Sequence, residues 1–182
     1  MKLEKTPLND LVVLEPRVFG DERGFFVETW NAKTFAELGL ELDFVQDNLS
    51  RSAQGILRGL HYQTEQTQGK LVRVTAGEVF DVAVDLRKSS STLGQWFGLH
   101  LSASNHKMLW VPPGFAHGFY VCSEYADFQY KCTELYHPAS EVALAWDEPT
   151  LAIDWPLVNG EPPQLSGKDK TGLRWDNIPL FD

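Results

Sequence analysis

The sequence predicts an all-β protein built as a sandwich or barrel of short strands. In the run from Glu78 to Arg87, apolar residues alternate with polar ones, which indicates a strand with one buried face. Similar short apolar runs recur along the chain and are separated by turn-forming residues. Only one segment has the pattern of a helix. Many short strands at this spacing are typical of sandwiches and barrels.

The individual elements follow from local patterns. Besides Glu78–Arg87, we expect strands at Leu11–Leu14, Gly24–Trp30, Leu71–Thr75, Trp96–Leu101, Lys107–Val111, Gly118–Cys122, Phe128–Leu135 and Val142–Trp146. The helix is expected after Asn31, which can cap it, and before Gly39, which stops it. From Trp155 to Lys170 the prolines and glycines predict a loop that could close over a site. The chain of 182 residues is expected to form one domain over residues 1–182.

Composition limits the classes of partner. The formal net charge of -9 repels polyanions, and no basic stripe is present, so we expect no nucleic-acid partner. No apolar run approaches membrane-spanning length and the N-terminus does not resemble a signal peptide, so we expect a cytoplasmic protein without a membrane partner. The two cysteines, Cys122 and Cys132, match no disulfide scaffold, redox motif or zinc spacing and are expected to be free thiols.

Two segments combine glycine with histidine. They are Gly55–Gln63, which contains His61, and Pro112–Phe119, which contains His117. Their spacing resembles the two half-motifs of the cupin superfamily. The resemblance implies a cupin-type jelly-roll barrel, the double-stranded β-helix, with a few short helices.

The same segments argue against a bound metal. Metal-binding cupins carry a second histidine two residues after the first and an acid several residues later. Here Gln63 takes the histidine position, Thr67 and Gln68 stand where the acid is expected, and Glu65 comes too early. Because a stable site needs at least three good donors, we predict no metal.

His61 is the first candidate for proton transfer. A lone histidine beside a strand is usually structural, and His100, His106 and His137 fit that description. His61 differs because several polar side chains crowd its otherwise apolar segment, and burying them without a task would be costly. Strict alternation puts Arg58 and His61 on opposite faces, so both reach one pocket only if Gly59 marks a bulge or the strand begins after it.

Seven runs narrow the resemblance from superfamily to family. They are Gly20–Glu28, Gln46–Asn48, Leu57–Gln63, Gln68–Arg73, Gly77–Arg87, Pro113–Phe119 and Leu165–Asp169. Together, and in this order, they resemble the dTDP-4-dehydrorhamnose 3,5-epimerase family over nearly the whole chain. The resemblance implies an isomerase of dTDP-L-rhamnose biosynthesis, a pathway of carbohydrate and lipopolysaccharide biosynthesis. The substrate would be a dTDP-4-keto-6-deoxyhexose inverted at C3 and C5 without a cofactor.

The chemistry of such a reaction sets a minimum group of residues. A carbon beside a ketone loses its proton only if one group takes the proton and another stabilises the enolate oxygen. Inversion then requires a proton donor on the opposite face of the sugar. The reaction therefore needs a base, an acid and a cation or hydrogen-bond donor at the carbonyl.

Four residues are the catalytic candidates. His61 suits the base, because an ordinary histidine pKa of about 6.5 leaves it partly neutral at cell pH. The resemblance implies that Asp169 orients it and that Tyr130 is the acid, although strand tyrosines more often belong to the core. Lys70 follows Gly69 at a strand entrance and could hold the oxyanion.

The remaining candidates would bind substrate. Arg23, Arg58 and Lys168 would hold the diphosphate, while Glu28, Gln46, Asp47 and Asn48 would contact polar edges of the base or sugar. The other substrate-binding candidates are Phe26 as a stacking surface, His117, Glu141 and Tyr136. The resemblance also implies a homodimer, in which Arg23 and Glu28 would serve the neighbouring subunit's site.

Other functions remain open at the level of sequence. A single-carbon epimerase or a 3,4-ketoisomerase acting on a related nucleotide sugar could use the same base and acid. A non-catalytic nucleotide-sugar-binding module is a second class, disfavoured because both His61 and Tyr130 are present. A metal-dependent cupin enzyme is a third, disfavoured by Gln63.

Overall fold

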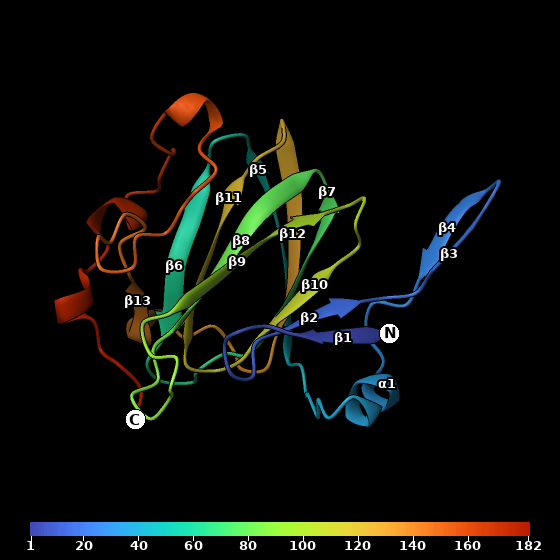
Figure 1. Ribbon diagram of the computed structural model, residues 1–182, viewed down its shortest axis with the longest axis horizontal. Helices are drawn as coiled ribbons and strands as arrows, with labels where there is room; N and C mark the ends of the chain where they lie inside the picture. The colour runs from blue at the N-terminus through green and yellow to red at the C-terminus, as the bar shows by residue number, and fades with distance from the viewer.

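The computed structural model describes residues 1–182 and is dominated by antiparallel strands (Figure 1). The strands are β1 (Lys2–Lys5), β2 (Val12–Glu15), β3 (Val18–Asp21), β4 (Gly24–Val27), β5 (Gln46–Ala53), β6 (Leu57–Gln63), β7 (Lys70–Ala76), β8 (Glu78–Asp85), β9 (Trp96–Ser102), β10 (Met108–Val111), β11 (Phe115–Val121), β12 (Tyr125–Cys132) and β13 (Glu141–Ala143). The helices are α1 (Ala32–Glu37) and the single 3₁₀ turns η1 (Pro138–Ser140), η2 (Val158–Gly160), η3 (Asp169–Thr171) and η4 (Trp175–Asn177).

Two sheets form the body of the molecule. The first has the strand order β1-β2-β10-β7-β12-β5, and the second has the order β13-β6-β11-β8-β9. A core of 15 buried residues joins them, with side chains such as Val72 and Phe128 from the first sheet and Ala83 and Phe119 from the second. The predicted all-β, cupin-type jelly roll is confirmed.

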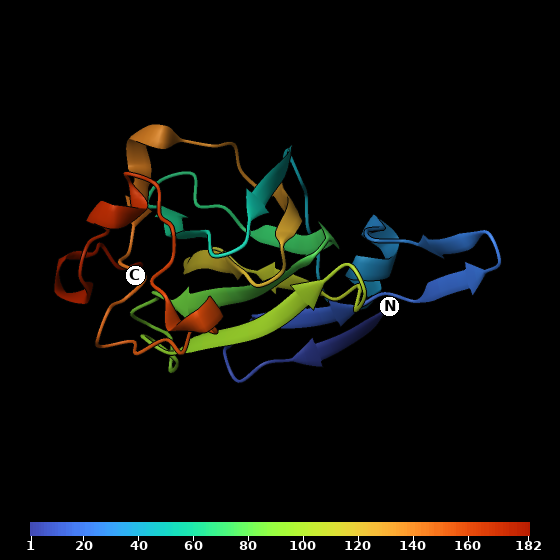
Figure 2. The ribbon, with the colours of Figure 1, turned by 90° about the horizontal axis from the view of Figure 1, so that it is seen from above.

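A third, two-stranded unit stands apart. The β3–β4 hairpin projects from one end of the molecule, as two perpendicular views show (Figures 1 and 2). Its side chains are largely exposed, with Phe25 at 63% and Phe26 at 69%. Large apolar side chains left in water in this way commonly mark an interaction surface.

Part of the outer face of each sheet is covered. Helix α1 begins where Asn31 accepts hydrogen bonds from the backbone N–H groups of Lys33 and Thr34, as predicted, and it buries Phe35 against the first sheet. The C-terminal segment covers the second sheet at the end of the molecule opposite the hairpin (Figures 1 and 2). No helix in the chain is both long and apolar enough to cross a bilayer.

Strand β8 corrects one expectation. The run from Glu78 was predicted to bury one face, yet Asp81 and Asp85 in β8 have no exposed surface. The alternating pattern suggested that the aspartates face solvent, because a sequence pattern does not show which buried side chains would bind them. Inside the molecule Asp81 accepts from His117, and Asp85 accepts from Arg87.

Other boundaries differ in detail. Strands β1, β3 and β5 were not expected, since their polar content hides the alternation. The expected strand at Gly24–Trp30 ends at Val27, and the one at Val142–Trp146 is only Glu141–Ala143. Both cysteines are free, as predicted, with Cys132 buried and Cys122 half-buried.

Candidate active site

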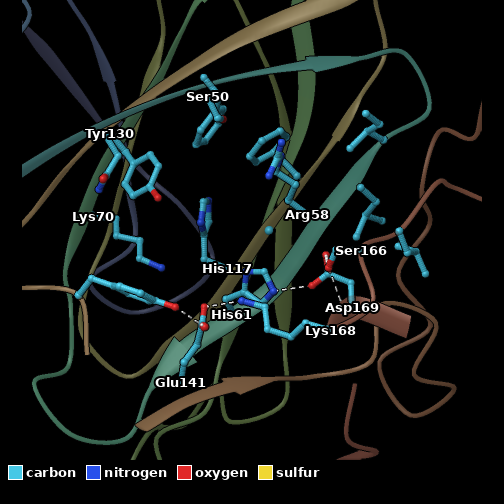
Figure 3. A pocket seen from close by; sticks show the side chains of 18 of the residues that line it. Ser50, Arg58, His61, Lys70, His117, Tyr130, Glu141, Ser166, Lys168 and Asp169 are labelled. Carbon is cyan, nitrogen blue, oxygen red and sulfur yellow. Dashed lines mark hydrogen bonds and ion pairs between the residues drawn. The ribbon is translucent and has the colours of Figure 1, made fainter. Parts of the chain in front are cut away.

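One large cavity opens between the two sheets. Its volume is about 750 Å³, and its polar lining residues include His61, Lys70, His117, Tyr130 and Asp169. Figure 3 shows these side chains converging on the same space from different elements. Four of the five come from two facing sheets, so a molecule in the cavity would have polar groups on both sides.

An irregularity in β6 brings His61 and Arg58 to this cavity together. His117 of β11 is paired with His61 of β6, and Phe119 of β11 is paired with Arg58 of β6. Between these two pairs β11 advances by two residues and β6 by three. One extra residue is thus accommodated in β6, which reverses the facing of the side chains beyond it. Gly59 lies in this stretch with a positive φ of 126°, where an added Cβ would be 2.5 Å from the Cα of Gly118. Of the two alternatives that the sequence left open, the structure has the bulge at Gly59.

His61 is held by a carboxylate. Its Nε2 lies 2.5 Å from Oδ1 of Asp169, at the start of η3. The hydroxyl of Ser166 donates to Oδ2 of the same carboxylate at 2.8 Å and accepts from the Asp169 backbone N–H at 3.2 Å. When Asp169 accepts from Nε2–H, the lone pair of His61 is on Nδ1 and can take a proton.

The electrostatics of this pair favour an ionised carboxylate. Burial alone would raise the pKa of Asp169, but the hydrogen bonds and charges of His61, Ser166 and Lys168 outweigh it and leave the pKa below its ordinary value. A carboxylate that stays charged stabilises an imidazolium beside it. The pair is thus suited to accept a proton from a bound molecule.

The opposite wall carries Lys70 on β7 and Tyr130 on β12. Burial lowers the pKa of Lys70 and raises that of Tyr130, so the lysine is more readily neutralised and the phenol holds its proton more firmly. Tyr130 also packs near Phe128, with ring centroids 6.0 Å apart. This wall offers a donor phenol and an amine, facing the histidine wall (Figure 3).

His117 forms a second histidine–carboxylate pair. Its Nε2 lies 2.9 Å and 3.0 Å from the two oxygens of Asp81, and both residues are buried. His117 lines the cavity, whereas Asp81 supports it from behind. Asp81 was missed because the alternation of β8 suggested solvent exposure.

Three candidates meet at the cavity rim. Glu141 accepts from Lys168 Nζ at 2.7 Å and from the Tyr136 hydroxyl at 2.9 Å. Burial acts to raise the pKa of Glu141, but these two hydrogen bonds and the charges of Lys168 and His61 hold it below its ordinary value. All three residues line the cavity, so the only cation of this group is already paired with a carboxylate.

Strand β5 separates the candidates that reach the cavity from one that does not. Its burial alternates, so Gln46, Asn48 and Ser50 line the cavity while Asp47 points outward and pairs with Lys131 at 2.9 Å. Asp47 therefore lies outside the cavity of this chain, and its contact with substrate stays a prediction. Ser50 was missed, although recognising the alternation of this strand would have found it.

The hairpin candidates also lie outside the cavity. Arg23 is 85% exposed and pairs with Asp21, while Phe26 is exposed and Glu28 accepts from Asn31 Nδ2 at 3.1 Å. None of the three lines the cavity of this chain. Their contact with substrate, including the expected contribution of Arg23 and Glu28 to a neighbouring subunit's cavity, stays a prediction.

Gln63, which replaces the second histidine of metal-binding cupins, is committed elsewhere. Its Nε2 donates to the carbonyls of Gln66 and Leu135, and its Oε1 accepts from the backbone N–H of His137. It is not among the cavity-lining residues. The two cupin-motif histidines, His61 and His117, each have a carboxylate partner. The second histidine and the later acid of metal-binding cupins are replaced in this sequence.

Ser166 is a further residue that sequence reasoning missed. It stands three positions before Asp169, a Ser-x-x-acid spacing in which the serine hydroxyl donates to the carboxylate of the acid and accepts from its backbone N–H. That spacing is a usable signal. It would have marked Asp169 as a positioned carboxylate rather than a mobile loop acid.

Comparison with known proteins agrees with this geometry. The family model described as dTDP-4-dehydrorhamnose 3,5-epimerase matches residues 5–177. Relatives of that name from Pseudomonas aeruginosa and Salmonella typhimurium are 57% and 56% identical, over 100% and 98% of this chain and 99% and 97% of their own. A crystal structure of a dTDP-6-deoxy-D-glucose-3,5-epimerase from Legionella pneumophila Philadelphia 1, in complex with dTDP-4-keto-L-rhamnose, superposes with a TM-score of 0.95. It is 55% identical and the match covers 99% of this chain and 97% of that one.

Proposed function

This chain belongs to the dTDP-4-dehydrorhamnose 3,5-epimerase family, and from that premise we propose how its own residues carry out the reaction. The enzyme epimerises C3 and C5 of dTDP-4-dehydro-6-deoxy-D-glucose to form dTDP-4-dehydro-L-rhamnose in dTDP-L-rhamnose biosynthesis. The observation that carries the mechanism is that the His61–Asp169 pair and Tyr130 line one cavity from opposite sides.

In this mechanism His61 removes the proton next to the ketone. Its Nδ1 accepts the proton, and the imidazolium is stabilised by Asp169, whose carboxylate stays charged because its pKa is held low. The electrons of the broken C–H bond move to the carbonyl oxygen and form an enolate. The same steps serve C3 and C5, because both carbons flank the C4 ketone.

Lys70 and Tyr130 complete the cycle from the facing sheet. The ammonium of Lys70 stabilises the enolate oxygen, and its lowered pKa eases proton sharing with that oxygen. Tyr130 then donates its proton to the carbon from the side opposite His61, which inverts the centre. Its raised pKa keeps the phenol protonated at neutral pH until the carbanion forms.

Substrate binding is assigned to the rim and floor of the cavity. Arg58, exposed at the cavity and steadied by a 2.9 Å hydrogen bond to Ser52, and Lys168 are the cations proposed to hold the diphosphate. Gln46 and Asn48 offer amides to the base or sugar. His117 and Tyr136 are proposed as further contacts, with Glu141 orienting Lys168 until substrate arrives.

Two copies are proposed to form the functional unit in the cytoplasm, each copy being a single domain. Arg23, Phe26 and Glu28 lie on the projecting hairpin, too exposed to serve their own cavity and well placed to reach another chain. Mixing His61→Ala with Arg23→Ala protein tests this. If sites are shared, a random mixture has half of its dimers mixed, and each mixed dimer has one intact site, so about a quarter of all sites become active. If each chain forms its own site, no intact site appears.

The proposed reaction is tested in heavy water. Purified protein is incubated with dTDP-4-keto-6-deoxyglucose, and NMR follows deuterium at C3 and C5. Label at both carbons, lost in His61→Ala, is the expected result. Label at one carbon would indicate a single-carbon epimerase, and unchanged exchange in His61→Ala would remove His61 from the mechanism.

A further inference from the structure

A second cluster of reactive side chains lies away from the cavity. Glu78 begins β8, His100 is in β9, and Cys122 follows β11. One oxygen, one nitrogen and the sulfur of these residues all lie within 4.8 Å of one another. None of the three lines the catalytic cavity.

The cluster is on the outer face of the second sheet. His100 is paired across the ladder with Phe80, and their rings are 5.2 Å apart. Phe80 and Cys122 pack against the apolar cluster that the C-terminal segment covers, whereas Asp81, the next residue of β8, faces the interior and His117. The sheet therefore separates this cluster from the catalytic residues.

Backbone hydrogen bonds hold the three strands at this point. The backbone N–H of Cys122 donates to the Glu78 carbonyl at 3.1 Å, and the Glu78 N–H donates to the Ser123 hydroxyl at 2.7 Å. On the other side, β8 pairs with β9 along the ladder from Glu78 opposite Ser102 to Val84 opposite Trp96. The three atoms that could bind a metal ion are thus brought together by neighbouring, hydrogen-bonded strands.

The spacing of the donors suits a small metal ion. In a tetrahedral zinc site, ligand atoms at bond lengths of about 2.0 to 2.3 Å are about 3.4 to 3.6 Å from each other. Oε1 of Glu78 and Nδ1 of His100 are already 3.0 Å apart. Moving the sulfur inward by at most about 1.4 Å would complete three positions of the tetrahedron.

We propose that Glu78, His100 and Cys122 form a binding site for one zinc-class divalent ion per chain, with water as the fourth ligand. The mixture of carboxylate oxygen, imidazole nitrogen and thiolate sulfur is the donor set of zinc and its neighbours rather than of magnesium or calcium. Glu78 and His100 are 43% and 50% exposed, so an ion has a path from solvent. Bound there, the ion would tie β8, β9 and the end of β11 together.

The competing explanation is an ordinary surface pair. Glu78 and His100 would simply share a hydrogen bond, and the thiol would lie beside them without a role. Only a bound ion requires all three side chains at once. The experiment therefore compares variants that remove the thiol and the imidazole one at a time.

The test is a zinc titration of reduced, full-length protein against a chromophoric chelator, followed by substitution with cobalt. We expect one equivalent of Zn²⁺ per chain, bound more weakly by at least about tenfold in Cys122→Ser and in His100→Ala. His106→Asn is the matched control, because it removes a nearby histidine outside the cluster. Cobalt should show a thiolate charge-transfer band in wild type that is absent in Cys122→Ser, and thermal unfolding checks that each variant is folded.

Several outcomes would overturn the proposal. These are no stoichiometric binding by folded wild-type protein, equal affinity in Cys122→Ser, or a cobalt spectrum without a thiolate band. Zinc lost in His61→Ala but kept in His100→Ala would place the ion in the catalytic cavity instead. Epimerisation is expected to continue at an unchanged rate in Cys122→Ser, so failure of the zinc site and failure of the catalytic mechanism are separable.

Discussion

Replacing Asp169 by asparagine isolates the charge behind His61. The side chain keeps its size, and an amide can still meet His61 Nε2 and Ser166, but the negative charge next to the imidazolium is lost. A hydrogen bond to a charged group contributes about 1.5 to 3 kcal/mol. Because each 1.4 kcal/mol changes a rate tenfold, kcat should fall by about 10- to 150-fold.

The assay is deuterium exchange at C3 and C5 together with steady-state turnover. Since Asp169 contacts His61 rather than the cavity centre, KM should change much less than kcat. Asp176→Asn, an exposed change of the same type in the C-terminal segment, is the matched control and should retain wild-type turnover.

A double variant tests whether Asp169 acts through His61. If it does, Asp169→Asn has nothing left to disturb once His61 is alanine, and the double variant should be no slower than His61→Ala alone. Losses that multiply would refute the reasoning. So would an Asp169→Asn enzyme with full turnover.

Four further outcomes follow from the same structure. Tyr130→Phe should reduce inversion at least about 100-fold in the NMR assay, because the hydroxyl that delivers the proton to the carbon is removed; near-normal turnover would exclude Tyr130 as the acid. Lys70→Gln should lower kcat by about 100- to 1000-fold with little effect on KM, and a change confined to KM would indicate a binding role only. Gly59→Ala places a Cβ 2.5 Å from Gly118 Cα and should lower the thermal midpoint by about 2 to 12 °C, whereas Gly167→Ala, with open space around it, should not. Asp169 has a lowered pKa in the folded state, so its stabilisation is present above the unfolded pKa of about 3.9 and is lost as the pH falls through the folded value. The difference in midpoint between wild type and Asp169→Asn should therefore shrink in acid, and a constant difference would contradict the assigned pKa.

The fold class was accessible from sequence because short alternating runs and turn residues carry it directly. The helix was equally accessible, since Asn31 and Gly39 mark its ends with local hydrogen-bonding and backbone preferences. Strand β5 was not, because a cavity-facing strand carries polar residues on both sides. Its inward residues, Gln46 and Asn48, resemble solvent-facing ones until the cavity is known.

The candidate site also contains residues that the sequence predicted and residues that it did not. His61 and Asp169 are 108 positions apart, so only the resemblance to a family could connect them before the fold was known. Asp81 was missed for the opposite reason, since its position in an alternating strand pointed to solvent. Arg23 and Phe26 were assigned to substrate binding, but local sequence pattern does not distinguish a residue that serves its own chain from one that reaches another, and for Arg23 only the family resemblance suggested the neighbour.

The close approach of the paired strands β6 and β11 at Gly59 and Gly118 has a consequence for redesign. At that point the two backbones touch, so the location of His61 depends on main-chain contact and not on the size of neighbouring side chains. Gln46, Asn48 and Ser50 belong to a different sheet and reach the cavity independently. Substrate preference can accordingly be altered along β5 while the base keeps its position, which makes that strand the place to begin when a different nucleotide or sugar is wanted.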